Sequence, residues 1–382
     1  MALSYLSERD VATYLQQRFV STSVPASLAA QLHQRTQGNP FFLVTIVDTL
    51  VETGALGNAE FQGRLNEPLD ALELSIPDSI RVLIDHQLER LQTRDRELLE
   101  AASVAGQSFS APAVAACVSG DVETAERGLD ALVQRQDFIL AQGMEVWPDG
   151  TYAMSYAFIH ALYQEVVYSQ VSASRKARWH QQIGVAKEMS YGPQAVDIAA
   201  ELSTHFLRAR DGHRAIGYLH QAGTNAMRRH AYQEGIDLLR QGLDALALFP
   251  DVTERLEPEL TLQLTLGGAL IAAKGYAAPE VEIAYERARQ LCGQIGANPR
   301  LLRVQLGLAA YYFSRAALET ATELGEQCVS LAQRDGAPAH LVQAHYALGS
   351  ALMFRGQFAQ AQDHFDQGIA LYEPSHHQPR AL

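Results

Sequence analysis

Lysine is scarce in this sequence: only Lys176, Lys187 and Lys274 occur among 382 residues, and none of them follows a glycine. A P-loop, which wraps the phosphates of ATP, needs the pattern GxxxxGK[ST], in which a glycine directly precedes the lysine. The sequence therefore contains no P-loop. We expect no ATP hydrolysis by this chain alone, and we predict that it is not an enzyme.

Cysteines and long apolar runs are also few. Cys117, Cys292 and Cys328 lie far apart and form no CxxC pair, which argues against a disulfide framework and favours a reducing compartment. No apolar run approaches the roughly 18 residues of a membrane span, and charges begin at Glu8. We therefore expect no membrane segment and no signal peptide, and we predict a cytoplasmic protein.

Patterns for metal and nucleophile chemistry are missing as well. Thirteen histidines are present, but none belongs to an HExxH pattern, and no GxSxG elbow occurs. The histidines of "SHHQP" (375–379) stand in a proline-containing tail, where solvated side chains are the simpler interpretation. We expect no metal site and no catalytic residue.

Positive charge is in deficit. Acidic residues outnumber basic ones by 43 to 30, which gives a net charge of −13 with histidine neutral. Within residues 75–170 six basic residues face fourteen acidic ones. Because proteins gain much of their affinity for DNA by neutralising phosphates, nucleic acid is disfavoured as a partner, and so is an anionic membrane.

The composition favours helix, and the second half of the chain repeats one helical pattern. Its glycines in Leu-Gly pairs recur after 40 and then 42 residues, at Gly267, Gly307 and Gly349. The segments that carry them are "LTLGGALIAAKGY" (264–276), "VQLGLAAYYFSRA" (304–316) and "YALGSALMFRGQF" (346–358). A period of this size predicts a solenoid of helical hairpins, in which small residues let the helices approach closely.

We predict about five hairpins between residues 195 and 374, interrupted at "FPDVTERLEPE" (249–259). Glu257 and Glu259 flank Pro258 there, and we expect them to be solvated charges in a connecting loop. The last hairpin resembles the tetratricopeptide repeat (TPR) through six positions: Leu348, Gly349, Gly356, Phe358, Ala361 and Phe365. By analogy with other solenoids, the concave face of the stack is expected to bind a protein partner.

Residues 75–190 have a different texture. Helical patterns at "IPDSIRVLIDHQLERL", "TRDRELLEAASVAG", "APAVAACV" and "DVETAERGLDALVQRQ" come before two short strand patterns that are joined by "WPDGT". Three or four helices followed by a β-hairpin predict a winged-helix arrangement. The basic cluster "SRKARWH" (174–180) follows the hairpin, and we expect it to be a solvated helix face that packs Trp179 inward.

The stretch "TQGNPFFL" (36–43) predicts a tight turn into a helix. Thr36, Gly38 and Asn39 are turn and cap residues, and Pro40 is suited to the first helical position. In "TIVDTL" (45–50) an apolar run ends in Asp48, but it lies inside this helix. We therefore interpret Asp48 as a helix-surface residue and not as a magnesium ligand.

Taken in order, four segments resemble the signal-transduction ATPases known as STAND proteins, which combine a P-loop domain, a helical lid, a winged helix and a TPR superhelix. The segments are "TQGNPFFL", "IPDSIRVLIDHQLERL", "LLEAASVAGQSFS" and "FIHALYQEVVYSQV". The resemblance implies a chain that corresponds to the C-terminal part of such a protein. It would comprise a lid remnant (1–74), a winged helix (75–190) and a TPR superhelix (191–382), and the fold class would be mainly α.

The resemblance also implies a set of nucleotide contacts. In STAND proteins the Gly-x-Pro turn lies in the lid beside the adenine, which corresponds to Gly38, Asn39 and Pro40, and a histidine after the wing reaches the phosphates, which corresponds to His160. ATP or ADP would be a cofactor only if another polypeptide supplied the P-loop in trans. A second interpretation of His160 is that it caps the helix that follows the wing.

Three hypotheses follow. The leading one is a non-catalytic regulatory and scaffolding protein that binds other proteins through its TPR repeats. The second is an ATP-binding regulator whose site is completed in trans by a P-loop domain. The third, which the charge disfavours, is a transcription regulator that binds DNA directly.

Overall fold

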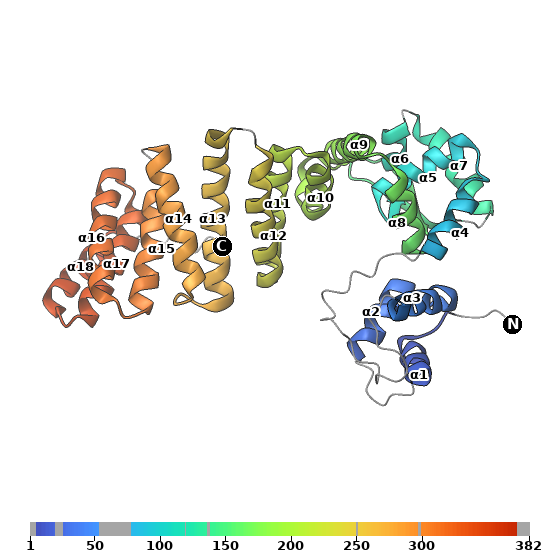
Figure 1. Cartoon of the computed structure of the whole chain (residues 1–382). Coiled ribbons are helices and arrows are strands. Elements are labelled where there is room, and N and C mark those ends of the chain that lie inside the picture. The colour runs from blue at the N-terminus through green and yellow to red at the C-terminus, as the bar shows by residue number, and fades with distance from the viewer. Residues whose placement is uncertain are drawn as a thin grey trace. The chain divides into compact units, whose positions relative to one another are not determined.

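The structure, a computed structural model, describes residues 5–19, 26–52, 78–118, 120–135, 138–249, 251–296 and 299–372. The chain divides into two compact units, Met1–Gly192 and Pro193–Leu382. The described residues form eighteen α-helices and three short strands (Figure 1), so the prediction of a mainly α protein is confirmed. Pro77, Pro374 and the "SHHQP" segment lie outside the described residues.

The first unit begins with three helices, α1 (Glu8–Phe19), α2 (Ala26–Thr36) and α3 (Pro40–Glu52). Ser7 and Asp10 cap α1 reciprocally: the Ser7 N–H donates to the Asp10 carboxylate at 2.9 Å, and the Asp10 N–H donates to Ser7 Oγ at 3.3 Å. The three helices share one apolar core. Asp48 lies on the outer side of α3, where it pairs with Arg18 at 2.8 Å, as expected of a helix-surface residue.

The rest of the first unit alternates helices and strands. In chain order the elements are α4 (Asp78–Leu88), α5 (Thr93–Ala105), β1 (Ser108–Ser110), α6 (Ala111–Val118), α7 (Val122–Arg135), β2 (Ile139–Val146), β3 (Tyr152–Phe158), α8 (Ala161–Gln170) and α9 (Ala173–Tyr191). The strands form one antiparallel sheet in the order β1-β3-β2. The predicted helices and the β2–β3 hairpin are therefore confirmed, and β1 was missed because three residues carry too little periodicity.

Local chemistry explains the hairpin and the position of α9. In the loop between β2 and β3, Gly150 has a φ of 87° and its N–H donates to the Trp147 carbonyl at 2.8 Å. On α9, Trp179 is buried and its Nε1 donates to the Cys117 carbonyl on α6 at 2.9 Å. The basic cluster at the start of α9 is partly paired, because Arg175 contacts both Glu97 and Glu100 of α5 at 2.7 Å.

The described residues of the second unit form a stack of nine α-helices: α10 (Ala199–Ala209), α11 (Gly212–Arg228), α12 (Tyr232–Ala245), α13 (Val252–Lys274), α14 (Pro279–Ile295), α15 (Leu301–Ser314), α16 (Leu318–Asp335), α17 (Pro338–Phe354) and α18 (Phe358–Ala370). Each helix packs against the next one along the chain, as Figure 1 shows. This is the TPR-like helical solenoid that the repeat period predicted.

Four of the turns in this stack share one backbone geometry. Their turn residues have positive φ (58–78°), and the N–H of the following residue donates to the carbonyl five positions back at 2.9–3.0 Å. This is the Schellman ending of a helix. The turn residues are Arg210, His230, Ala316 and Gly356. Only one of the four is a glycine, so the sequence marks these turns poorly.

Glycines in the stack allow large side chains to cross between helices. The ring of Tyr285 on α14 lies between Gly267 of α13 and Gly307 of α15, where an added Cβ atom would stand 2.7 Å and 2.4 Å from ring atoms. Gly349 of α17 receives the ring of Phe365 on α18 in the same way, at 2.8 Å. These close contacts leave no space for a side chain, which explains why the repeat period appears in the sequence as regularly spaced glycines.

The predicted interruption at 249–259 is wrong. Helix α13 begins at Val252 and runs through Pro258, so this segment is mostly helical. Glu259 forms a two-point ion pair with Arg287, and Glu257 pairs with Arg300 at 2.9 Å, so these charges are not free loop carboxylates. Proline removes one helical hydrogen bond, and packing of the buried leucines after Pro258 together with the ion pairs keeps the helix continuous.

Within the described ranges, no helix has the length and apolar character needed to cross a membrane.

Two neighbouring glycines of α13 provide a direct test of the close contact between Tyr285 and Gly267. Gly267→Ala is expected to lower the free energy of unfolding of the second unit by roughly 1–3 kcal/mol, because the new methyl group collides with Tyr285. Gly268→Ala is the matched control: its Cβ meets no atom within 4 Å, and alanine favours helix by about 1 kcal/mol. Hydrogen–deuterium exchange across α13–α15 should become faster in the first variant only. Equal exchange in both variants would contradict the close approach.

Candidate functional site

The predicted Gly-Asn-Pro turn joins α2 to α3. Asn39 Oδ1 accepts hydrogen bonds from the N–H groups of Phe41, at 3.0 Å, and Phe42, at 3.4 Å. Asn39 is therefore the N-cap of α3, and Pro40 occupies the first helical position, where no backbone N–H is required. Both residues have clear roles in starting the helix.

Gly38 is required by a close backbone contact. Its φ is 74°, and an added Cβ would stand 2.0 Å from the carbonyl oxygen of Leu6. The Leu6 N–H donates to the Gly38 carbonyl at 2.8 Å, and Nε2 of His33 lies 3.1 Å from the Leu6 carbonyl oxygen. The turn is therefore fixed against the segment that precedes α1.

His160 connects the turn after α2 to the start of α8. Its Nδ1 accepts a hydrogen bond from the Leu162 N–H at 3.1 Å, which caps α8. Its Nε2 lies 2.7 Å from the carbonyl oxygen of Thr36, and because a carbonyl can only accept, Nε2 carries the proton. The side chain is 1% exposed. The imidazole is thus held as one neutral tautomer with both nitrogens engaged.

Further contacts join the same elements. The Phe42 ring meets the His160 ring edge to face, with centroids 4.6 Å apart. Arg35, at the end of α2, forms a two-point ion pair with Glu165 of α8, in which Nη2 and Oε2 are 2.6 Å apart. The structure therefore brings the stretch that contains Gly38, Asn39 and Pro40 close to His160, although more than a hundred residues separate them in the sequence.

The chemistry of His160 follows from this environment. Burial lowers the pKa of His160 below its ordinary value of 6.5, outweighing the opposite effect of the hydrogen bond to Thr36. A neutral ring with both nitrogens already bonded acts as a structural link between α2 and α8. In this arrangement the ring presents no free donor, and its role as a helix cap is the one that the geometry supports.

Helix α7, which precedes the β2–β3 hairpin, carries more acidic than basic residues. Helix α7 carries Glu123, Glu126 and Asp130 against two arginines, and one of these, Arg135, pairs with Asp95 at 2.8 Å. Tyr156 of β3 donates its hydroxyl proton to Asp130 at 2.8 Å. A phosphate backbone placed along this helix would meet mostly carboxylates.

The three cysteines are buried and free of disulfides. Burial raises the pKa of Cys328 to about 12, and it also raises the pKa values of Cys117 and Cys292. A thiol must ionise to act as a nucleophile, so these side chains are packing residues. Among the described side chains, no group of three or more histidine, cysteine or acidic residues is placed to hold a metal ion.

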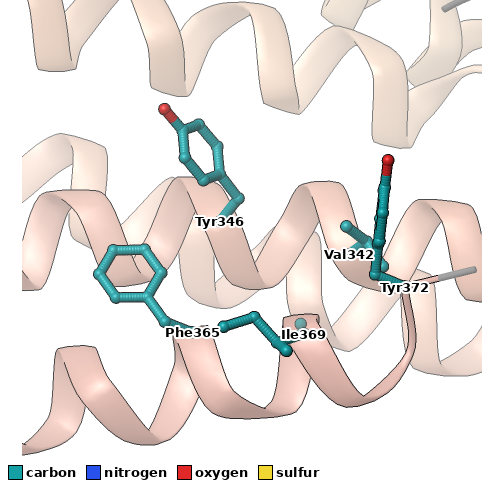
Figure 2. Close-up of a pocket in the computed structure, with 6 residues that line it drawn as sticks. Val342, Tyr346, Phe365, Ile369 and Tyr372 are labelled. Carbon is teal, nitrogen blue, oxygen red and sulfur yellow. The ribbon is translucent and has the colours of Figure 1, made fainter. Parts of the chain in front are cut away.

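An apolar hollow opens on the last hairpin of the second unit. It has a volume of about 300 Å³ and is lined by residues of α17 and α18 and by Tyr372, two positions after the end of α18: Val342, Tyr346, Phe365, Gly368, Ile369 and Tyr372. We call these six residues the α17–α18 patch. Figure 2 shows the rings of Tyr346 and Tyr372 at opposite ends of the hollow, with Phe365 and Ile369 along one side.

Each residue of the α17–α18 patch has an equivalent 40 positions earlier in the sequence, in the preceding hairpin. These equivalents show that the exposure of the patch is unusual for this fold. Ile369 and Tyr372 are 72% and 50% exposed, whereas the equivalent Val329 and Ala332 are 9% and 0% exposed. The other equivalents are Leu302, Leu306, Gly325 and Cys328. Five of the six are buried and Leu306 is partly buried, because they pack beneath α17. The α17–α18 patch is therefore an internal packing surface without a covering helix among the described residues.

The α17–α18 patch was not predicted from the sequence. Phe365 and Gly349 were noted as repeat positions, but Tyr346, Ile369 and Tyr372 look like ordinary core residues of a repeat. The available signal was the 40-residue offset between the turns at Ala316 and Gly356. Aligning the hairpins on these turns shows which residues should be covered by a following helix.

Comparison with known proteins gives limited similarity. No protein-family model matches the chain. A protein from Rhizobium meliloti (strain 1021), named only as uncharacterised, is 22% identical over 312 residues, which is 81% of this chain and 29% of that protein. The chain therefore spans less than a third of the length of this curated relative.

Several solved structures are similar at a low level. BtubC from P. vanneervenii has 17% identity and a TM-score of 0.40, over 55% of this chain and 86% of that one. Nearly identical TPR-like repeats from Podospora anserina have 20% identity and a TM-score of 0.40, over 55% of this chain and all of that one. A STAND protein with a TPR sensor from Pyrococcus horikoshii has 10% identity and a TM-score of 0.30, over 97% of this chain and 60% of that one.

The link through His160 predicts a pH dependence. Because its pKa is lower in the folded state, the unfolded chain binds more protons as the pH falls below about 6.5, and the first unit should lose stability there. The two tryptophans, Trp147 and Trp179, both lie in the first unit, so their fluorescence in urea follows this unit alone. The loss of stability between pH 7.5 and pH 5.5, both chosen about one unit from 6.5, should be smaller in His160→Gln.

The control for this test is His340→Gln, an exposed histidine of the second unit. It should leave the tryptophan transition and its pH dependence unchanged. An equally steep pH dependence in His160→Gln and the native chain would show that His160 does not titrate in this window.

Proposed function

We propose that this chain is a non-catalytic protein-binding module, and that a partner protein binds the second unit at the α17–α18 patch. The observation that carries the proposal is the contrast between equivalent positions: Val329 and Ala332 are buried in one hairpin, whereas Ile369 and Tyr372 are exposed in the next. Contiguous exposed apolar side chains usually mark interaction sites. Two tyrosines at the rim suit a protein interface, since a tyrosine ring can pack against a partner while its hydroxyl group forms hydrogen bonds.

Chemistry elsewhere in the chain supports binding over catalysis. The buried cysteines have raised pKa values, His160 is fully hydrogen-bonded, and the sequence contains no glycine-lysine pair for a P-loop. The concave face of the stack, which the sequence analysis favoured, remains a further predicted surface for protein binding. Free buried thiols are compatible with the expected cytoplasmic location.

We further propose that the chain has the three-part organisation of STAND regulators, with a lid remnant (1–74), a winged helix (75–190) and a TPR superhelix (191–382). Support for the winged helix comes from the order of α5, β1, α6, α7, β2 and β3 and from the three-stranded antiparallel sheet. Support for the lid comes from the contacts of Thr36 and Phe42 with His160. The excess of acidic over basic residues on α7 supports a role in packing and signalling in place of DNA binding.

A nucleotide test separates this proposal from the alternative of an ATPase completed in trans. Isothermal titration of the full chain with ATP and with ADP, each with magnesium, should show no saturable binding. The physical reason is the missing P-loop lysine, which would otherwise contact the phosphates. Micromolar binding that is lost in Asn39→Ala or His160→Gln would contradict the proposal and assign the nucleotide to the α2–α8 junction.

A capture experiment tests the binding surface. The tagged full chain is used as bait in an extract of its source cells, and bound proteins are identified by mass spectrometry. Ile369→Glu, which places a charge in the patch, should reduce recovery of a specific partner by at least about tenfold, equivalent to roughly 1.4 kcal/mol. The expected cause is burial of an unpaired carboxylate at the interface.

The matched control is Ile283→Glu, because Ile283 is a similarly exposed apolar residue on α14 (68% against 72% for Ile369). It should retain the partner. Equal recovery by the native chain and both variants would show that binding does not use the patch. Recovery of no specific protein by the folded native chain would contradict the proposed function itself.

A further inference from the structure

In the interior of the stack, the first helix of each hairpin covers the second helix of the hairpin before it. These contacts show which side chains a covering helix presents. Where α14 presents the large ring of Tyr285, the covering helix α15 presents Gly307. Where α16 presents Gly325, the covering helix α17 presents Leu348, whose Cα would lie 3.0 Å from an added Cβ. Large residues on one helix are therefore matched by small residues on the next, and the reverse also holds.

The α17–α18 patch can be interpreted by the same rule. Phe365 occupies the position of Gly325, and Gly368 occupies the position of Cys328. Phe365 already packs against Gly349 on one side, and its other side faces the hollow. A covering helix must therefore be small where it crosses Phe365. Because Gly368 is smaller than the cysteine it replaces, the hollow also has room for a large apolar side chain beside that crossing.

We infer that the occupant of the α17–α18 patch is an amphipathic α-helix of a partner protein, with glycine or alanine over Phe365 and a large apolar residue in the hollow at Gly368. This inference rests on the proposed protein-binding function and specifies the partner of the same surface. The helix continues an interface that the described chain already forms between α12 and α13, between α14 and α15 and between α16 and α17.

The charge near the patch adds one requirement. Asp366 is exposed on α18 and stands three positions before Ile369, on the same side of the helix. The whole chain is also strongly acidic, with a net charge of −13. A basic residue at the edge of the partner helix would therefore be favourable.

A second copy of this chain fits the patch less well. In a symmetric dimer the patch would face itself, so Phe365 would need a small residue from the same set of six. Gly368 is the one small member of that set, but it forms the recessed floor of the hollow, with its Cβ position 3.6 Å from His345 Cβ, so it cannot lie over the ring of Phe365 in another copy. Phe365 would therefore meet only large side chains.

The chain itself provides a probe for this inference. A synthetic peptide of residues 299–316, "PRLLRVQLGLAAYYFSRA", contains α15, which places Gly307 over an aromatic ring and carries three arginines. A fluorescent version should bind the full chain saturably in an anisotropy titration. A matched peptide with Gly307→Leu should bind at least about tenfold more weakly, since overpacking costs roughly 1–3 kcal/mol.

This comparison separates shape from general hydrophobicity. Leucine makes the peptide more apolar and more helical, so a nonspecific apolar contact would strengthen with Gly307→Leu. Binding of the glycine peptide should also fall at least about tenfold when the chain carries Ile369→Glu and stay unchanged with Ile283→Glu. Equal or tighter binding of the leucine peptide, or no saturable binding of the glycine peptide, would overturn the inference.

Other occupants give distinct results. A dimer in sedimentation velocity that Ile369→Glu dissociates would assign the patch to a second copy. Markedly tighter peptide binding by a chain that stops at Tyr372 would assign it to residues 373–382. If Ile369→Glu abolishes partner capture while the two peptides bind alike, the proposed function stands and the helical partner does not. If neither capture nor peptide binding responds to Ile369→Glu, both proposals fail.

Discussion

The helix crossings from α13 to α18 depend on one packing constraint: a large side chain on one helix meets a small residue on the next. Tyr285 satisfies this constraint twice, because Gly267 and Gly307 leave space on both faces of its ring. Gly325 and Leu348 satisfy it with the sizes reversed. The same constraint sets the spacing of the helices, the positions at which an added methyl group would collide, and the shape of the surface that α17 and α18 present to a partner.

The sequence showed this constraint only partly. The glycines at positions 267, 307 and 349 predicted the solenoid, but the 42 residues between Gly307 and Gly349 differ from the 40 residues that separate the turns at Ala316 and Gly356 in the same two hairpins. The positive-φ residues Arg210, His230 and Ala316 are not glycines, so glycine alone does not mark these turn positions. Pro258 misled the analysis for the opposite reason: proline usually ends a helix, yet tertiary packing holds α13 continuous through it.

In the first unit, the residues of the predicted nucleotide site were indicated by resemblance alone. Turn chemistry explained Asn39 and Pro40 from the sequence, since an Asn cap followed by proline starts a helix. No local rule could place Thr36 beside His160, because the contact joins elements 124 residues apart. The need for glycine at position 38 was similarly invisible, since it comes from the approach of Leu6, which precedes α1.

The identity of the exposed residues on α18 supports an interaction more strongly than their number does. Ile369 and Tyr372 are 72% and 50% exposed, so the packing of α17 against α18 does not require them to be apolar. Polar side chains at both positions would leave that packing unchanged and would remove an apolar surface that favours aggregation. A helix that covered the hollow would make both side chains part of a core, as Val329 and Ala332 already are beneath α17. The proposed binding of a helix would explain the apolar side chain of Ile369, and packing of α17 against α18 alone does not.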